Sequence, residues 1–197
     1  MASTSDRLDI TRTSDVELVR MATGGNNVAF SELVSRHGGS LRTHMRRMGA
    51  QSADADDMAQ EAFMTAYEHL TEYRFDGPLI GWLKKIASRR YLRKVRSSAK
   101  YVLTDDVTSF DVVEHRDLVS KVHNLDAALD RLRPAERLCV TLNFSGELSH
   151  QEIADELKIP LGTVKSHIRR GLEQLKTILS PSVAQAQKTK PFLETGS

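Results

Sequence analysis

The sequence predicts an all-α protein of two small helical domains joined by a flexible linker, the C-terminal domain containing a helix-turn-helix. Three observations lead to this class. Apolar residues recur at helical spacing almost throughout, and we find no convincing strand pattern outside the short run 101–104. Clusters of Gly, Asn and Pro interrupt that spacing. Residues 97–124 are rich in Ser, Asp, Val and Thr with weak periodicity, which is typical of a linker.

The composition is that of an ordinary globular chain. Of the 197 residues 40% are hydrophobic and 27% are charged, and 28 Lys and Arg against 26 Asp and Glu leave a net charge of +2. The distribution of charge must therefore decide whether a polyanion is a partner. The single cysteine, Cys139, excludes a disulfide framework or a Cys-rich metal site, and we expect it to be a small buried hydrophobe.

Catalysis finds no support in the motifs. The seven histidines show no metal-ligand spacing shared with Cys or acidic residues. Neither a nucleophile elbow nor a phosphate-binding glycine loop is found in the sequence. We therefore expect no enzyme activity, no cofactor and no metal.

The apolar runs and the first residues also predict the cellular compartment of the protein. None approaches the roughly 18–20 residues that span a bilayer. Residues 1–6 lack the basic and apolar regions of a secretory signal. We expect a cytoplasmic protein with no membrane insertion.

Local signals mark the first two helices of the N-terminal domain. Ser14 and Glu17 form a capping box that opens a short helix, and the glycines and asparagines of 24–27 end it. A second helix follows over about 28–48. The pair Gly38 and Gly39 lies inside it and predicts a bend or a break.

Two further helices are expected over about 53–70 and 79–96, separated by the breaker sequence Phe-Asp-Gly-Pro at 75–78. The first carries an apolar face and, on other faces, a compact acidic block. The second begins a stretch from 79 to 100 that holds eight Lys and Arg and no acid. An acid-free run of this length favours a polyanion-binding surface over a simple solvated face.

The segment 148–175 has helix-turn-helix spacing. Ser149 and Glu152 form a capping box for its first helix, and Lys-Ile-Pro at 158–160 makes the turn. The second helix, about 161–179, should bury a stripe formed by Val164, Ile168, Leu172 and Leu175. Its opposite face should present donors to a DNA major groove, namely Thr163, Lys165, Ser166, His167, Arg169 and Arg170. The alternative is an ordinary αα-hairpin, which leaves this acid-free polar face unexplained.

Three blocks together resemble bacterial RNA polymerase sigma factors of the extracytoplasmic-function (ECF) type, in the sigma-70 family. They are Asp-Ala-Asp-Asp-Met-Ala-Gln-Glu-Ala-Phe at 54–63, Gly-Trp-Leu-Lys-Lys-Ile-Ala-Ser-Arg-Arg-Tyr-Leu-Arg-Lys-Val-Arg at 81–96, and the helix-turn-helix. They occur in the family's order, with a linker between the second and third. The resemblance covers about 15–96 and 125–180.

The resemblance implies five segments. Residues 1–14 are an N-terminal tail, 15–96 a region 2-like domain, 97–124 the linker, 125–180 a region 4-like domain, and 181–197 a disordered tail. Region 2 would dock on polymerase and hold the −10 element as single-stranded DNA, and region 4 would read the −35 duplex. Core RNA polymerase, promoter DNA and an anti-sigma factor are the implied partners.

The resemblance also assigns roles within region 2. An acidic and amide face would dock on the clamp helices of the polymerase beta-prime subunit, through Asp54, Asp57, Gln60 and Glu61. Aromatic side chains at Tyr73 and Phe75 would stack on melted bases, whereas Trp82 is expected in the core. Cations would contact the −10 backbone, at Lys84, Lys85, Arg89, Arg90, Arg93 and Lys94. Family members often have Asn and Asp in place of Arg89 and Arg93.

Two other classes of protein stay open. A sigma-like decoy that only binds an anti-sigma factor should have lost its DNA-facing cations, which this chain keeps. A plain helix-turn-helix regulator would bind promoter duplex by itself and would not need the acidic block at 54–61.

Overall fold

The computed structural model describes residues 10–97 and 123–180, and within those ranges it contains helices and no strand. Most of the predicted linker, the run 101–104 and the tails 1–9 and 181–197 lie outside the described residues. The two described ranges correspond closely to the two helical domains that the sequence predicts.

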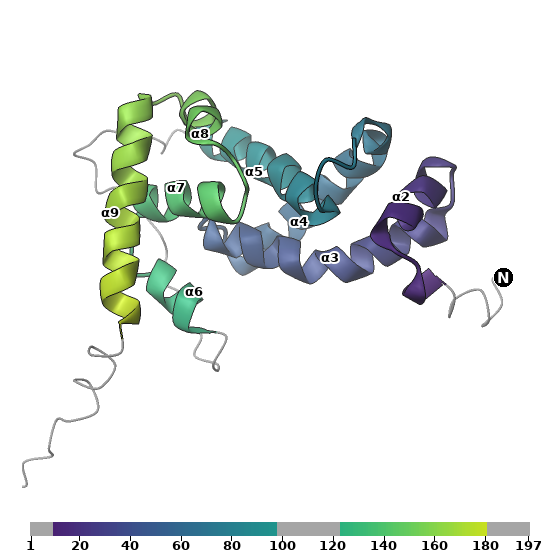
Figure 1. Cartoon of the computed structure of the whole chain (residues 1–197), viewed down its shortest axis with the longest axis horizontal. Coiled ribbons are helices and arrows are strands. Elements are labelled where there is room, and N and C mark those ends of the chain that lie inside the picture. Colours follow the sequence, from purple (N-terminus) through teal and green to yellow (C-terminus); the bar gives the residue numbers. More distant parts are fainter. Residues whose placement is uncertain (1–9, 98–122, 181–197) are drawn as a thin grey trace, which may run out of the picture.

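The N-terminal domain is organised around one long helix. Its elements are α2 (Asp15–Thr23), α3 (Asn27–Arg47), α4 (Ser52–Glu68), a short 3₁₀ helix η1 (Leu70–Glu72) and α5 (Leu79–Ser97). Helix α3 packs against α2, α4 and α5 (Figure 1). The buried side chains between them are mainly Leu, Ala and Met, with Leu33, Leu41 and Met45 almost fully enclosed.

The start of α2 shows one of the two bonds of the predicted capping box, and the glycine pair does not break the helix that contains it. Ser14 accepts the backbone N–H of Glu17 at the start of α2. Helix α3 continues through Gly38 and Gly39 without a break, so that part of the prediction is wrong. The reason is tertiary: buried residues on both sides, Leu33 and Leu41, hold the helix against its neighbours, and this outweighs a cost of about 1 kcal/mol per glycine.

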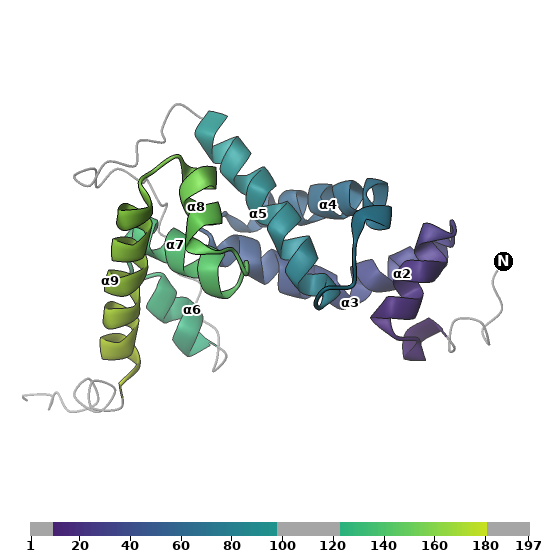
Figure 2. The same ribbon diagram turned by 45° about the horizontal axis from the view of Figure 1, so that its top comes forward.

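The C-terminal domain contains four helices within the described residues. They are α6 (His123–Leu129), α7 (Pro134–Phe144), α8 (His150–Leu157) and α9 (Leu161–Leu179). Helix α9 packs against the other three, and both ribbon views show it at the end of the molecule opposite α2 (Figures 1 and 2).

Helices α8 and α9 form the predicted helix-turn-helix. Ser149 and Glu152 make the reciprocal capping box, and Lys158 adopts a left-handed conformation (φ 58°) in the turn. The predicted stripe on α9 is buried except for Leu172, which is 39% exposed, so its assignment was wrong. Gly171 faces inward in its place, because a Cβ there would lie 2.8 Å from Val140 Cγ2 and only glycine permits this approach of α7.

The two domains are packed together, which the linker pattern did not predict. Leu142, Leu148 and Ile153 of the C-terminal domain belong to the same buried cluster as Leu41 and Leu83 of the N-terminal domain. Helix α7 contacts α3, and α8 contacts α5 (Figure 2).

Candidate polymerase and nucleic-acid interfaces

The predicted docking residues lie along α4, but two of them are engaged by α5. Asp57, Gln60 and Glu61 are exposed. Arg90 Nη2 lies 2.8 Å from Glu61 Oε2, and Lys94 Nζ lies 2.8 Å from Asp54 Oδ1. These pairs join residues assigned to polymerase with residues assigned to DNA.

Because of these pairs, the basic run on α5 is not one uniform surface. Its hydrogen bond to Asp54 raises the pKa of Lys94, and burial lowers the pKa of Lys84. Arg89 faces the other domain, where its Nε lies 3.2 Å from Glu156 Oε1 and its Nη2 lies 3.9 Å from Glu152 Oε1. Arg93 is exposed. The run is acid-free in sequence, but acids from α4 and α8 partner several of its cations.

The segment between η1 and α5, together with the first turn of α5, carries a row of three aromatic rings. The ring of Tyr73 lies 5.5 Å from that of Trp82 and 4.8 Å from that of Phe75. Trp82 packs against the core as predicted, whereas Phe75 is 44% exposed and has a positive φ of 59°. The Tyr73 hydroxyl donates to the carbonyl of Gly77, which fixes the loop. The exposed ring of Phe75 lies at the end of this row and is supported by Tyr73, so it is suited to stacking on a nucleic-acid base.

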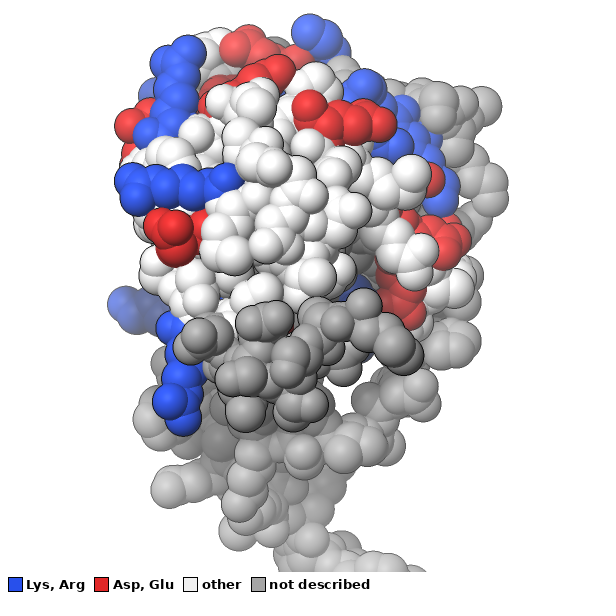
Figure 3. All heavy atoms as spheres, turned by 90° about the vertical axis from the view of Figure 1, so that its right-hand side faces the viewer, with Lys and Arg blue, Asp and Glu red and all other residues white. Residues whose placement is uncertain are grey.

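Sequence reasoning missed Arg20 as a member of this site. Its guanidinium carbon lies 5.9 Å above the Phe75 ring, a cation–π arrangement. Arg20 belongs to α2, 55 positions before Phe75, and no local pattern links them. The end of the molecule that carries α2 shows neutral side chains at its centre and charged ones around the edge (Figure 3).

The predicted −35 residues on α9 differ in how far they are exposed. Lys165 is exposed, as is Arg169, which pairs with Glu173 one turn later, while Thr163 and Ser166 are half-buried. His167 is only 8% exposed, so its predicted place on the outer face was wrong. It lies at the flank of α9 that packs on the domain, where its Nδ1 is 3.0 Å from Arg170 Nη2.

Polar contacts join the domains around the C-terminal end of α3. Arg137 Nε donates to the carbonyl of Arg47 (2.8 Å), and its Nη2 donates to the carbonyl of Arg46 (2.6 Å). Arg47 Nε is 2.6 Å from Asp126 Oδ1. At Arg47 the carbonyl of the helix end accepts from Arg137 and from the Thr141 hydroxyl, whereas the Arg46 carbonyl also accepts the backbone N–H of Gly49.

A buried histidine completes this junction. His44 lies between the hydroxyls of Ser88 (Nε2, 2.8 Å) and Ser145 (Nδ1, 3.0 Å), one from each domain. Burial, with smaller effects from Lys84 and Arg47, lowers the pKa of His44 to about 3. The neutral imidazole can therefore donate to one hydroxyl and accept from the other.

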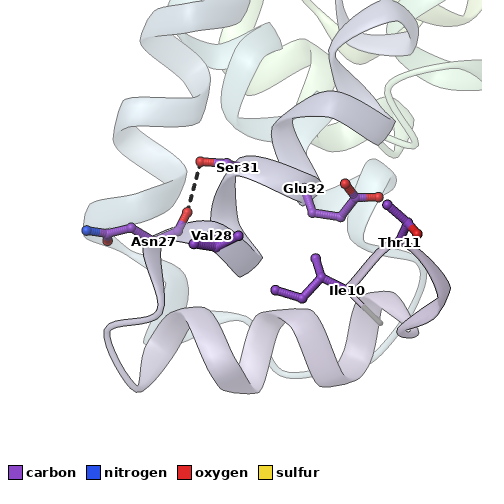
Figure 4. A pocket seen from close by; sticks show the side chains of 6 residues that line it. All are labelled: Ile10, Thr11, Asn27, Val28, Ser31 and Glu32. Atoms are coloured by element: carbon purple, nitrogen blue, oxygen red, sulfur yellow. Dashed lines mark hydrogen bonds between the residues drawn. The ribbon is translucent and has the colours of Figure 1, made fainter. Parts of the chain in front are cut away.

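A hollow of about 420 Å³ lies beside the start of α3, lined by Ile10, Thr11, Asn27, Val28, Ser31 and Glu32 (Figure 4). Glu32 is the one carboxylate of the described lining, and no cluster of reactive side chains surrounds it there. Within residues 10–97 and 123–180, no helix is both long and apolar enough to cross a membrane.

Two family models match the sequence. The model described as Sigma-70 region 2 matches residues 33–101, and the one described as Sigma-70, region 4 matches residues 128–177. Together they include the acidic face, the aromatic row, the basic helix and the helix-turn-helix.

Individual relatives agree with these matches. The chain is 31% identical over 160 residues to the ECF RNA polymerase sigma factor SigE of Mycolicibacterium smegmatis, covering 77% of this chain and 62% of that one. It is 28% identical over 183 residues to the ECF RNA polymerase sigma-E factor of Haemophilus influenzae, covering 85% and 96%. Among solved structures, CnrH in complex with the cytosolic domain of CnrY is similar with a TM-score of 0.48 and 26% identity, covering 84% of this chain and 96% of CnrH.

Proposed function

The chain belongs to the sigma-70 family of RNA polymerase sigma factors, among those of the ECF type, and we propose that it directs core RNA polymerase to specific promoters. The observation that carries this proposal is the presence, in one chain, of an acidic helical face, an aromatic loop and a helix-turn-helix with a cationic outer face. A regulator that binds only duplex DNA needs the last of these alone. A protein that acts on polymerase and promoter DNA should act in the cytoplasm.

The residues divide this work between the domains. Asp57, Gln60 and Glu61 offer exposed carboxylates and an amide to a basic helical partner, and Asp54 extends that face. Phe75, supported by Tyr73, offers a ring to a melted −10 base. Cations along α5 attract the DNA backbone, from Lys84, Lys85, Arg89, Arg90 and Arg93. On α9 the contacts to the −35 element come from Thr163, Lys165, Ser166, Arg169 and Arg170. The buried His167 supports them through its contact with Arg170.

Promoter binding requires the two domains to separate. Two DNA sites two helical turns apart lie about 70 Å from each other, whereas here α8 contacts α5 directly. The 25 residues from 98 to 122, between α5 and α6, could reach at most about 85 Å when fully extended, so the chain is long enough. Arg89 would then exchange Glu152 and Glu156 for DNA phosphates.

Run-off transcription with purified core polymerase tests the proposal. A randomised promoter library is transcribed with and without the chain, and specific transcripts should require it. Asp57→Lys with Glu61→Lys should abolish both the transcripts and polymerase binding, because like charges then face the basic partner. Asp56→Lys is the matched control on the same helix, since Asp56 is paired with Arg42.

Four outcomes separate the candidates. Loss of output with the control intact supports docking through the acidic face. Equal effects of all three reversals contradict that face. Binding to promoter duplex without polymerase would identify a plain regulator instead, and tight binding only to an inhibitory protein would identify a decoy.

The family resemblance supports one further partner, an anti-sigma factor that holds the chain inactive. Such a protein must reduce the amount of this chain bound to core polymerase. Core polymerase and the anti-sigma factor are mixed with the purified chain. Size-exclusion chromatography then measures how much of the chain stays bound to polymerase.

A further inference from the structure

Glu136 is a buried carboxylate behind the predicted DNA-reading helix. It lies in the first turn of α7, is 1% exposed, and faces α9. Its Oε1 is 3.3 Å from Arg170 Nε, and its Oε2 accepts a hydrogen bond from Gln174 Nε2 at 3.1 Å. A buried carboxylate is costly unless it is paired, so these two partners on α9 account for its presence.

The close approach of α7 and α9 places Glu136 beneath Arg170. A Cβ on Gly171 would lie 2.8 Å from Val140 Cγ2 and 3.4 Å from Glu136 Cβ. Because residue 171 is glycine, α7 comes close enough for the Glu136 carboxylate to contact Arg170, the preceding residue of α9. This geometry differs from that of an ion pair formed on the surface of a single helix.

Arg170 is held at two points while part of its side chain stays in solvent. Its Nε is buried and contacts Glu136 at ion-pair distance without hydrogen-bond geometry. Its Nη2 lies 3.0 Å from His167 Nδ1. The side chain nevertheless remains 40% exposed. Arg169, by contrast, is 67% exposed and pairs only one turn along its own helix, with the 61% exposed Glu173.

We propose that Glu136 is a positioning residue for −35 recognition, which orients the Arg170 guanidinium toward one base pair. The proposal rests on the function proposed above and adds a residue that does not touch DNA itself. A guanidinium held in one orientation can make the paired hydrogen bonds that distinguish guanine in the major groove. A freely rotating one is attracted equally to any phosphate.

A purely structural role for Glu136 makes a different prediction. An acid in the first turn favours α7 through the helix dipole, and its removal would weaken the fold and lower transcription from every promoter alike. A positioning role changes the preference at one base position. The two roles therefore differ in which promoters lose activity, whatever the change in stability.

The experiment uses holoenzyme assembled from core polymerase and the full chain. A promoter selected by the wild-type chain is made in every single-base variant of its −35 element, and run-off transcripts are counted for each. Wild type is compared with Glu136→Gln, Glu136→Asp, Arg170→Ala and the double variant Glu136→Gln/Arg170→Ala. Glu173→Gln is the matched control, because it removes the exposed partner of Arg169 on the same helix.

Glu136→Gln should reduce discrimination at one position by about fivefold or more, the lower limit for one good base contact. Arg170→Ala should affect the same position, and the double variant should add nothing further. Glu136→Asp keeps the acid of the first turn but shortens its reach, so it should affect that position too. Glu173→Gln should leave the position unchanged.

Some results would overturn the proposal. An equal loss at all promoter variants, or different positions for Glu136→Gln and Arg170→Ala, would leave Glu136 a structural residue only. If Glu136→Gln does not fold, Glu136→Asp decides between the same outcomes. Failure of the wild-type chain to support any transcript would instead count against the proposed function.

Discussion

The imidazole of His44 shows how one residue can link stability to pH. Ser88 donates to the sulfur of Met48 (3.5 Å) and so accepts from His44 Nε2–H, which leaves Nδ1 to accept from Ser145. A proton on Nδ1 would place a charge in a buried site near Lys84 and Arg47, and this is why the pKa falls to about 3.

His44 predicts a fall in stability as the solution becomes acidic. The unfolded chain binds a proton near pH 6.5 and the folded chain only near pH 3, so the free energy of unfolding decreases as pH falls between these values. From pH 7.5 to pH 5 the loss should be about 2 kcal/mol. Urea unfolding at both pH values measures it.

The control is His44→Gln, which can donate and accept but cannot titrate. Its loss between the two pH values should be smaller than that of the wild type by about the same amount. An identical loss in both chains would assign the acid sensitivity to other groups.

At the scale of elements, α9 depends on two glycines in different ways. Gly171 faces α7 at a distance that no Cβ can occupy, whereas Gly162, near the start of the same helix, has open space around it. Because both residues are glycine, the effect of the same alanine substitution can be compared at the two positions.

Gly171→Ala should destabilise the chain by about 1–3 kcal/mol through overpacking against Val140. Gly162→Ala should stabilise it by up to about 1 kcal/mol, because alanine favours helix. Thermal unfolding of both variants tests this. Similar shifts in both would contradict the close packing of α7 and α9.

The capping box of α8 predicts a second local effect. Ser149→Ala removes the acceptor for the Glu152 N–H and should cost about 1 kcal/mol. Ser31→Ala is the comparison, since its hydroxyl only bonds back to the carbonyl of Asn27 in the same helix and its loss should be close to neutral. Chemical denaturation of the two variants should therefore give different midpoints, and equal midpoints would exclude a role for the cap.

At the scale of the whole molecule, the junction between the domains is stabilised by polar contacts around a shared apolar cluster. Arg137 is its most connected cation, since it donates to two carbonyls at the end of α3 and pairs with Asp130. Its guanidinium therefore holds α3 and α7 together.

Arg137→Ala should loosen this junction and increase the radius of gyration in small-angle X-ray scattering, because it removes the hydrogen bonds from α7 to the carbonyls of Arg46 and Arg47 and the ion pair with Asp130. Arg131→Ala is the control, as Arg131 is exposed in the same domain. An unchanged radius for Arg137→Ala would show that the apolar cluster alone holds the domains together.

Local patterns were sufficient for much of this protein. The predicted capping residues Ser14 and Ser149 act within three positions of themselves, and helical spacing identified buried residues such as Val164 and Ile168. These features depend on neighbours in the sequence, and so the sequence alone was enough to predict the helices, the two domains and the family resemblance.

Only the tertiary structure decided which charges meet. Arg89 pairs with acids more than 60 positions away, Arg170 pairs with Glu136 on α7, and His44 contacts Ser145 in the other domain. An acid-free run such as 79–97 predicts attraction to a polyanion, but the packing of α4 and α8 determines which of its cations remain exposed. Sequence determines local preference, whereas burial and long-range pairing depend on how the helices pack.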